Sequence, residues 1–247
     1  LFAHGFGCDQ AMWRFVAPAF ARDRTTITFD YLGMGRSDRR AYDPRRYATL
    51  DGYAEAVLEI CDALDLRDVT FVGHSVSATV GILAALRSPA RFRHLVLVAP
   101  SPCFVNHPPE YHGGFEPADI DGLLALMDQN FVGWAEHLAP LIARNAAHPE
   151  LSGELRDSFC AADPVIARQF AALTFRADNR ADLPHVRVPS LILQVANDAI
   201  APREVGEYMA RHLAGSVLHV VDAEGHCPHL SHPRETIDAI ARYLAAA

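Results

Sequence analysis

Short apolar runs alternate along this chain with longer segments in which apolar residues recur at helical spacing. The strand-like runs are residues 25–30, 69–74, 94–100, 189–195 and 217–222. The helix-like segments are residues 51–66, 77–87, 204–213 and 235–244. Because such alternation builds parallel strands joined by helical crossovers, it predicts an α/β fold with a mostly parallel, doubly wound sheet covered by helices on both faces.

One long segment interrupts this alternation. Residues 116–178 contain helix-like sequence with no convincing strand. Doubly wound sheets bind ligands at the carboxyl ends of their strands, so a helical insertion there would cover the site. We expect a core of residues 1–115 and 179–247 under a lid of residues 116–178. The chain also begins inside a strand-like run with no initiator Met, so we expect one or two strands, and any targeting signal, to precede it.

Charge and cysteine usage exclude several classes of protein. The formal net charge is −8 and no basic run occurs, which disfavours nucleic acid and anionic membrane surfaces as partners. No apolar run reaches the ~18 residues of a membrane span. The five cysteines are odd in number, widely spaced and without a C-x-x-C pair, which is typical of free thiols rather than of a disulfide framework or zinc site. With no visible signal peptide, we expect a cytoplasmic location.

The stretch "VGHSVSA" (72–78) nearly matches G-x-S-x-G, the turn that presents a nucleophilic serine between a strand and a helix. Ser75 would be that nucleophile. Ser77 stands where the motif has its second glycine, and a serine is small enough for this departure to be sterically mild. The alternative is an ordinary turn before a buried helix.

A serine nucleophile needs a base, which we expect late in the chain because the order in this motif is Ser, acid, His. The stretch "DAEGHCPHLSHP" (222–233) offers three histidines. His226 follows the last strand-like run after a short loop and is the candidate. His229 and His232 lie further toward the last helix, where structural or surface roles are the simpler interpretation. No H-E-x-x-H pattern accompanies them, so no metal is expected.

The acid should follow a strand that precedes the histidine. Asp198 follows the run 189–195; its alternative is a turn residue in an Asn-Asp pair, and its rival Asp222 is too close in sequence to His226. An oxyanion hole needs two backbone N–H groups. We expect them from Val76, which follows the nucleophile, and from Phe6 in an "HGFG" loop whose glycines let the backbone approach the site.

These motifs resemble a narrow branch of the α/β-hydrolase superfamily that contains the bacterial sigma-B energy-stress regulatory hydrolase (RsbQ-like) and the plant strigolactone and karrikin receptors. The resemblance extends over nearly the whole chain and rests on "HGFGCDQAMW", "FDYLGMGRSD", "GHSVSA", "SPCFVNHPPEYHGGFE" and "GHCPHLSHP". The bacterial member is more similar at "CDQ", "SPC" and "PPEYHGGF", whereas "GHSVSA" resembles the plant form. Ser77 is therefore a variant known within this branch.

The resemblance implies an α/β-hydrolase core under a V-shaped lid of four helices, with a deep and mostly apolar pocket. It implies an aromatic pocket lining formed by Phe6, Phe104, Phe115, Trp134 and Phe175. The alternative for each of these rings is ordinary packing inside the lid.

Two functions follow from this combination. The first is hydrolysis of a small apolar ester or lactone by Ser75, His226 and Asp198 with no cofactor, in a stress-signalling role. Carbon–carbon bond hydrolases and cofactor-free haloperoxidases share these residue types and stay open as alternatives. The second function is a small-molecule receptor whose lid binds a regulatory partner, such as a PAS-domain phosphatase, with slow or incidental hydrolysis.

Overall fold

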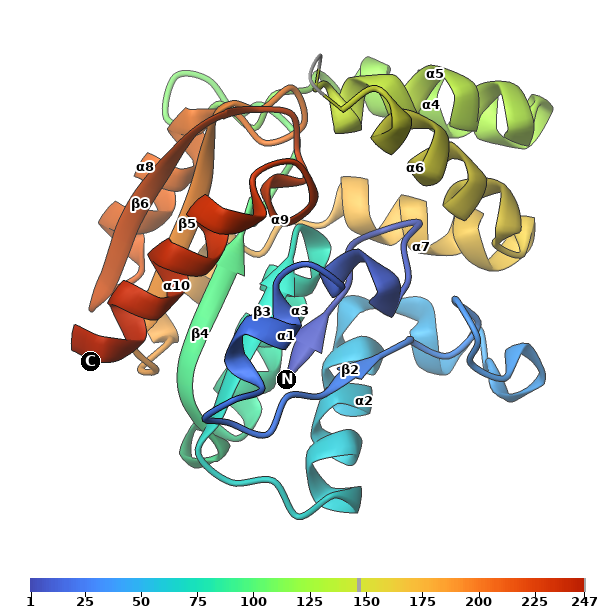
Figure 1. Ribbon diagram of the computed structural model, residues 1–247. Helices are drawn as coiled ribbons and strands as arrows, with labels where there is room; N and C mark the ends of the chain where they lie inside the picture. Colours follow the sequence, from blue (N-terminus) through green and yellow to red (C-terminus); the bar gives the residue numbers. More distant parts are fainter. Residues whose placement is uncertain (146–147, 247) are drawn as a thin grey trace.

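The computed structural model describes residues 1–145 and 148–246. Six strands form one sheet in the order β2-β1-β3-β4-β5-β6, and every neighbouring pair is parallel (Figure 1). The strands are β1 (Phe2–Ala3), β2 (Thr28–Phe29), β3 (Val69–His74), β4 (Phe92–Val98), β5 (Ser190–Asn197) and β6 (Ser216–Glu224). The α/β class and the parallel sheet predicted from the sequence are confirmed.

Helices cover both faces of this sheet. They are α1 (Ala17–Phe20), α2 (Leu50–Ala63), α3 (Val76–Arg87), α8 (Arg203–His212), α9 (Pro228–Ser231) and α10 (Pro233–Ala246). In Figure 1, α1 and α10 lie in front of the strands, and α3 and α8 lie behind them. Helix α3 is buried along nearly all of its length, as a helix that is apolar on every side must be. In the part of the chain that the structure describes, no helix is long and apolar enough to cross a membrane.

The largest difference from the predicted strands is at one edge of the sheet. Strand β3 spans residues 69–74 as predicted, whereas β2 contains only Thr28 and Phe29 of the run 25–30. Strand β2 is the edge strand and pairs only with β1, which itself offers only Phe2 and Ala3. A ladder ends where its partner ends, so the outer part of the run cannot be paired there.

Between β4 and β5 the chain forms four helices, which we call the lid helices. They are α4 (Pro117–Gln129), α5 (Phe131–Ala143), α6 (Glu150–Ala161) and α7 (Pro164–Arg176). The break between α4 and α5 is at Asn130, whose side chain accepts a hydrogen bond from the Gly133 N–H and so caps α5. Figure 1 places the lid helices beyond the carboxyl ends of β3 and β5. The expected four-helix insertion is therefore present.

The chain enters the lid helices through residues 99–116, which follow β4, and leaves them through residues 177–179, which precede a short 3-10 helix (Arg180–His185) and then β5. We call these two segments the lid neck. They contact each other directly, through an isolated antiparallel bridge between Cys103 and Asp178 and a 2.8 Å hydrogen bond from the Asn179 N–H to the Pro102 carbonyl. The lid thus enters and leaves the core at one place.

Candidate active site

Ser75 lies on a sharp turn between β3 and α3. Its φ of 54° and ψ of −121° are unusual for a residue other than glycine, and such strain is typical of a serine presented by a nucleophile elbow. The turn leaves no space at Gly73, where a Cβ atom would lie 2.4 Å from the Ser77 carbonyl oxygen. The first glycine of the motif is therefore required by backbone contact.

The Ser77 side chain is small enough for the turn and also makes two hydrogen bonds of its own. Its hydroxyl is fully buried, donates to the His4 carbonyl at 2.5 Å and lies 3.0 Å from the Tyr31 hydroxyl. His4 opens the loop that follows β1, so Ser77 connects the turn at Ser75 to the loop that carries Phe6. A glycine at this position could make neither contact.

The structure brings Ser75, His226 and Asp198 together in one hydrogen-bonded chain. The Nδ1 atom of His226 lies 2.7 Å from Oδ2 of Asp198, and its Nε2 atom lies 2.8 Å from the Ser75 hydroxyl oxygen. An ionised carboxylate only accepts hydrogen bonds, so Nδ1 carries the ring proton and Nε2 is left to accept from Ser75. All three side chains are buried, which protects these contacts from water.

Each of these three residues lies just after the end of a strand. Asp198 directly follows β5, and its Oδ1 atom accepts hydrogen bonds from the backbone N–H groups of Ile200 and Ala201 at 2.8 and 3.1 Å. The residue before His226, Gly225, has a φ of 85° and donates from its N–H to the Asn197 carbonyl. The acid and the histidine are thus joined at the backbone as well as through their side chains.

The backbone of His226 is held by two further groups that the sequence did not indicate. Its N–H donates to the Ile142 carbonyl at 2.7 Å, and Ile142 belongs to lid helix α5. Its carbonyl accepts from Nε2 of His74, the residue before the nucleophile, at 2.8 Å. One lid helix therefore positions the histidine directly.

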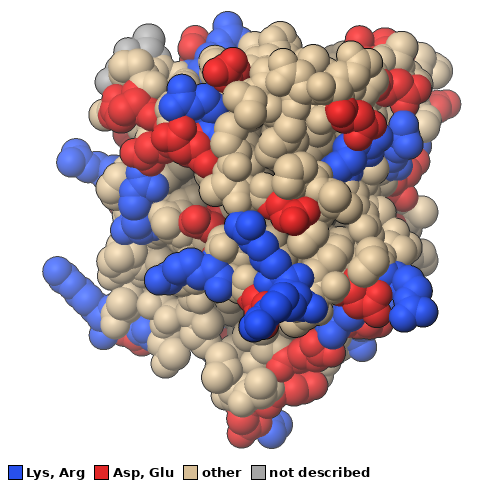
Figure 2. All heavy atoms as spheres, turned by 90° about the vertical axis from the view of Figure 1, so that its right-hand side faces the viewer, with Lys and Arg blue, Asp and Glu red and all other residues tan. Residues whose placement is uncertain are grey.

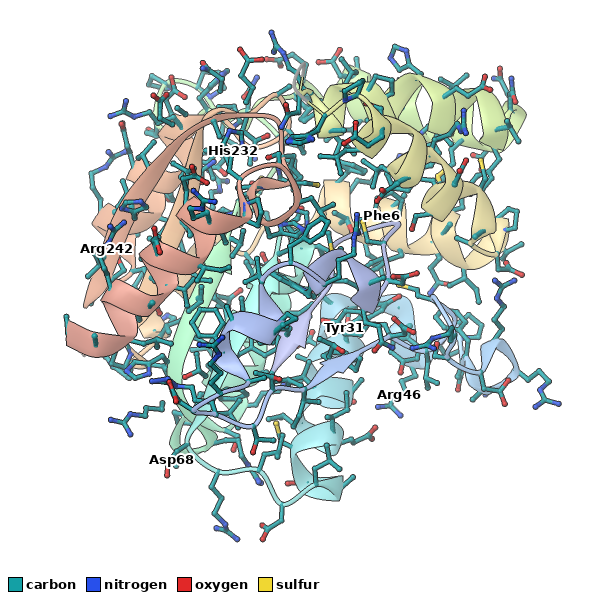
Figure 3. All side chains as sticks on the ribbon, viewed as in Figure 1. Phe6, Tyr31, Arg46, Asp68, His232 and Arg242 are labelled. Atoms are coloured by element: carbon teal, nitrogen blue, oxygen red, sulfur yellow. The ribbon has the colours of Figure 1, made fainter. Side chains whose placement is uncertain are left out.

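Of the two predicted oxyanion donors, Val76 directly follows Ser75, and Phe6 borders the same cavity as Ser75. Val76 is the first residue of α3, where backbone N–H groups have no partner within the helix. Phe6 lies on the loop after β1, the strand that pairs with the end of β3. This loop packs directly on the elbow, because a Cβ atom on Gly5 would lie 2.4 Å from Nδ1 of His74. Figure 3 shows Phe6 on this loop, facing the lid helices.

A small cavity of about 20 Å³ lies beside Ser75. Of the five predicted lining residues, Phe6, Phe104 and Phe175 border it, whereas Phe115 and Trp134 do not. Trp134 instead packs within the lid against Phe6, Phe131 and Phe159, and Phe115 packs against Phe175 from behind. Each of these two rings packs against a ring that borders the cavity, Trp134 against Phe6 and Phe115 against Phe175, and so supports the lining.

Other residues border this cavity without any signal in the sequence. They are Cys8, Leu155, Ile142, Thr174, Ile200 and Cys227. Most come from elements distant in sequence from the three catalytic candidates, so only the fold brings them together.

Among the larger hollows elsewhere, two differ in their position relative to the strands. One of about 160 Å³ shares Phe6 and Cys8 with the cavity at Ser75 and extends between the loops of the core and helices α6 and α7. The other, of about 470 Å³, is lined by Leu1, Thr70 and Leu244 among others, at the opposite ends of the strands. Ligands of parallel sheets bind at the carboxyl ends, so the large hollow is not the one that bears on Ser75.

The two less favoured histidines have different surroundings. His229 is fully buried, packs against Trp13 and His74, and has no hydrogen-bond partner for either ring nitrogen among the described residues. Burial lowers the pKa of His229 to about 3, helped by repulsion from His226. The Nδ1 atom of His232 lies 2.9 Å from the hydroxyl oxygen of its neighbour Ser231. Neither reaches Ser75.

Comparisons with known proteins show what this chain is similar to. Residues 1–239 match the model of the alpha/beta hydrolase family. The strigolactone esterase RMS3 of Pisum sativum is 39% identical over 234 residues, 94% of this chain and 87% of that protein. The karrikin insensitive 2 receptor CA of Petunia hybrida is 36% identical, covering 98% of this chain and 90% of that protein. The solved structure of a hydrolase from Oleispira antarctica superposes with a TM-score of 0.96 at 44% identity, over 100% of this chain and 90% of that one.

Proposed function

This chain belongs to the alpha/beta hydrolase family, and from that membership together with the geometry at Ser75 we propose that it is a serine hydrolase of small apolar esters or lactones. The observation that carries the proposal is the continuous chain Ser75 Oγ, His226 Nε2, His226 Nδ1 and Asp198 Oδ2, with contacts of 2.8 and 2.7 Å. This arrangement makes a serine hydroxyl nucleophilic at neutral pH.

The reaction would proceed in two halves. His226 takes the hydroxyl proton of Ser75 as its oxygen attacks the carbonyl carbon, and the N–H groups of Phe6 and Val76 stabilise the oxyanion. The imidazolium then gives this proton to the departing alkoxide oxygen, which leaves an acyl group on Ser75. In the second half His226 deprotonates a water molecule that attacks the acyl carbonyl, and the same proton returns to Ser75. Asp198 orients the ring and stabilises its charged form throughout.

The class of substrate is supported by the lining of the cavity and by the relatives. Side chains at Phe104, Phe175 and Ile200 offer apolar contacts and few hydrogen bonds. The curated relatives include an esterase named for strigolactone and a receptor named for karrikin. A space of about 20 Å³ is smaller than any such molecule. Residues 116–178 therefore act as a lid that moves over the core of residues 1–115 and 179–247.

The first experiment uses a fluorophosphonate reagent followed by mass spectrometry of the intact protein. We expect one adduct on Ser75 and none in Ser75→Ala, while Ser152→Ala on the outside of α6 keeps the adduct. A panel of small lactones then reports which acyl groups are turned over. An adduct on another residue, or full esterase activity in Ser75→Ala, would refute the assignment.

The contact between α5 and His226 favours a second role, in cytoplasmic signalling. Because Ile142 of the lid holds the backbone of His226, the state of the site and the position of the lid are linked. A receptor would use this link to present a changed lid surface to a regulatory partner, such as a PAS-domain phosphatase. Capture of a phosphatase that depends on bound ligand, and that survives in Ser75→Ala, would favour sensing over turnover.

A further inference from the structure

Three potential metal ligands meet at the lid neck, outside the site described above. They are the thiol of Cys103, the imidazole of His107 and the carboxylate of Asp178. The Nε2 atom of His107 lies 3.6 Å from Sγ of Cys103 and 3.9 Å from Oδ2 of Asp178. All three ligand atoms lie within 4.8 Å of one another. One nitrogen faces both partners, so the arrangement converges on a point and does not form a relay through the ring.

These separations suit a tetrahedral ion. Bonds of about 2.0–2.3 Å to sulfur, nitrogen and oxygen place the ligand atoms of a zinc ion roughly 3.3–3.7 Å apart. The distance between Cys103 and His107 already has this value, and that between His107 and Asp178 needs to shorten by only a few tenths of an ångström. A mixed set of one sulfur, one nitrogen and one oxygen is typical of zinc and unsuited to calcium or magnesium.

The surroundings allow an ion to enter and to be held. Cys103 is buried, while the side chains of His107 and Asp178 remain about two-fifths exposed, so water can reach the cluster and supply a fourth ligand. Arg180 donates to Asp178 through Nε at 2.8 Å and Nη2 at 2.6 Å, and its guanidinium lies 4.9 Å from the centre of the Tyr111 ring. Ligating carboxylates commonly carry such a second hydrogen-bond partner, which fixes their orientation.

We propose that Cys103, His107 and Asp178 bind a zinc-type divalent cation, with water completing the coordination, and that the ion ties together the two segments of the lid neck. Cys103 and His107 belong to the segment that enters the lid, and Asp178 belongs to the segment that leaves it. The ion therefore adds a cross-link beside the backbone bridge and the hydrogen bond that already join the segments.

The cross-link would also reach the cavity at Ser75. Phe104 directly follows Cys103 and Phe175 precedes Asp178 by three residues, and their rings lie 5.4 Å apart in the cavity lining. An effect of the ion on turnover rests on the proposed hydrolase function. Binding of the ion does not, and it is tested separately.

The other mixed cluster of this kind among the described residues is less suited to an ion. His74, Cys227 and His229 lie behind the catalytic histidine and are fully enclosed. Nε2 of His74 already donates to the His226 carbonyl, and Gly5 packs against its Nδ1 atom. All three residues of this inner cluster are buried, so an ion would have to lose its water before it could bind there. The inner cluster therefore serves as the competing outcome of the test.

The test is titration of the metal-stripped full chain with Co²⁺, which replaces zinc and reports thiolate ligation by a charge-transfer absorption band. We expect one ion per chain, loss of the band in Cys103→Ala, and an affinity weakened by at least about 10-fold in His107→Ala. His107 is partly exposed, so its variant should fold normally. Cys160→Ala removes an exposed cysteine outside the cluster and should leave the titration unchanged.

Zinc should also raise the melting temperature of the wild type and not that of His107→Ala, because an ion that binds only the folded chain stabilises it. The proposal is overturned if no thiolate band forms, if the band persists unchanged in His107→Ala and Asp178→Asn, or if it is lost in Cys227→Ala. None of these results depends on whether Ser75 hydrolyses an ester.

Discussion

The proposed catalytic centre and the contact between lid and core are built from different interactions. Around His226, the ring and the backbone are held by directional hydrogen bonds with Asp198, Ser75, Ile142 and His74. Between lid and core, aromatic rings pack together alongside a few hydrogen bonds, such as that from Ser158 to the Gly7 carbonyl. Phe170 alone packs against Phe6, Tyr31 and Tyr53. The first region should therefore respond to the loss of single atoms, and the second to the loss of volume.

The outer face of the lid contributes little to this difference. Figure 2 shows acidic and basic side chains mingled over the face that it presents. The ion pairs of α7, Arg168 with Asp128 and Arg176 with Asp121, are partly exposed at 2.8 and 2.7 Å. Exposed pairs contribute about 0–1 kcal/mol each. Both pairs join α7 to α4 inside the lid, so they do not hold the lid on the core. The pair of Arg14 with Glu154 does connect core and lid, and it is likewise partly exposed.

The comparison is tested most strongly at Ser75. We expect Ser75→Ala to lower kcat for an ester by about 10⁶-fold, because the nucleophile is lost while the fold is kept. The melting temperature should change by only a few degrees. Ser152→Ala is the matched control with unchanged activity. A Ser75→Ala variant that unfolded would show that this site also stabilises the fold, which would contradict the comparison of the two regions.

Asp198→Asn should lower kcat by about 10⁴-fold. The amide can still accept from Ile200 and Ala201 N–H groups, but it presents a donor to Nδ1 of His226 and so favours the wrong tautomer. Asp222→Asn is the control, since Asp222 is exposed on β6. Steady-state kinetics of both variants measure the difference in kcat. A loss of kcat in Asp222→Asn as large as that in Asp198→Asn would contradict the assignment of Asp198 as the acid.

Phe170→Ala should destabilise the protein by about 3–5 kcal/mol, because a fully buried ring leaves a cavity between α7 and the core. Val165→Ala on the exposed side of the same helix should cost less than about 0.5 kcal/mol. Urea unfolding gives both values. Loss of hydrolysis on the scale of Ser75→Ala in a folded Phe170→Ala protein would contradict the separation of the two regions.

Ser77→Ala should cost about 1–3 kcal/mol, since it removes the donor to the His4 carbonyl and leaves the buried Tyr31 hydroxyl without this partner. Tyr31→Phe in the Ser77→Ala background should cost less than in the wild type. Denaturant unfolding of the four proteins of this cycle gives the coupling. Strict additivity would mean that the two hydroxyls do not interact.

The last prediction concerns the change in folding stability per pH unit. Because burial lowers the pKa of His229 to about 3, the folded chain keeps this ring neutral while the unfolded chain binds a proton below about 6.5. Stability should therefore fall as pH decreases from about 6.5 to 3, by up to about 1.4 kcal/mol per pH unit from this group. His229→Leu should show a shallower decrease, and His232→Leu should keep the wild-type slope. An unchanged slope in His229→Leu would remove His229 as the cause.

Much of the site could be read from the sequence because its parts are local. Ser75, Asp198 and His226 each follow a strand, and the ends of parallel strands meet at one edge of the sheet, so the motif order was enough to select them. Gly73 was equally predictable, because the turn allows no side chain there.

The strand boundaries and the cavity lining were less predictable. The run 25–30 has strand-forming residues along its length, but the length of β2 depends on how many residues its partner offers. Trp134 and Phe115 have the residue type of a pocket lining, and their distance from the cavity depends on which neighbours stand in front of them. The bacterial half of the family resemblance and the partner that it implies remain predictions.

The sequence by itself determined the α/β fold and the hydrolase family, and it selected the residues proposed as nucleophile, acid and base, because periodicity and short motifs encode them directly. Only the tertiary structure decided that Ile142 holds His226, that Ser77 bridges to His4 and Tyr31, and that Cys103 and His107 meet Asp178. These contacts join residues far apart in the chain, and no local pattern specifies a distance between segments that only packing brings together.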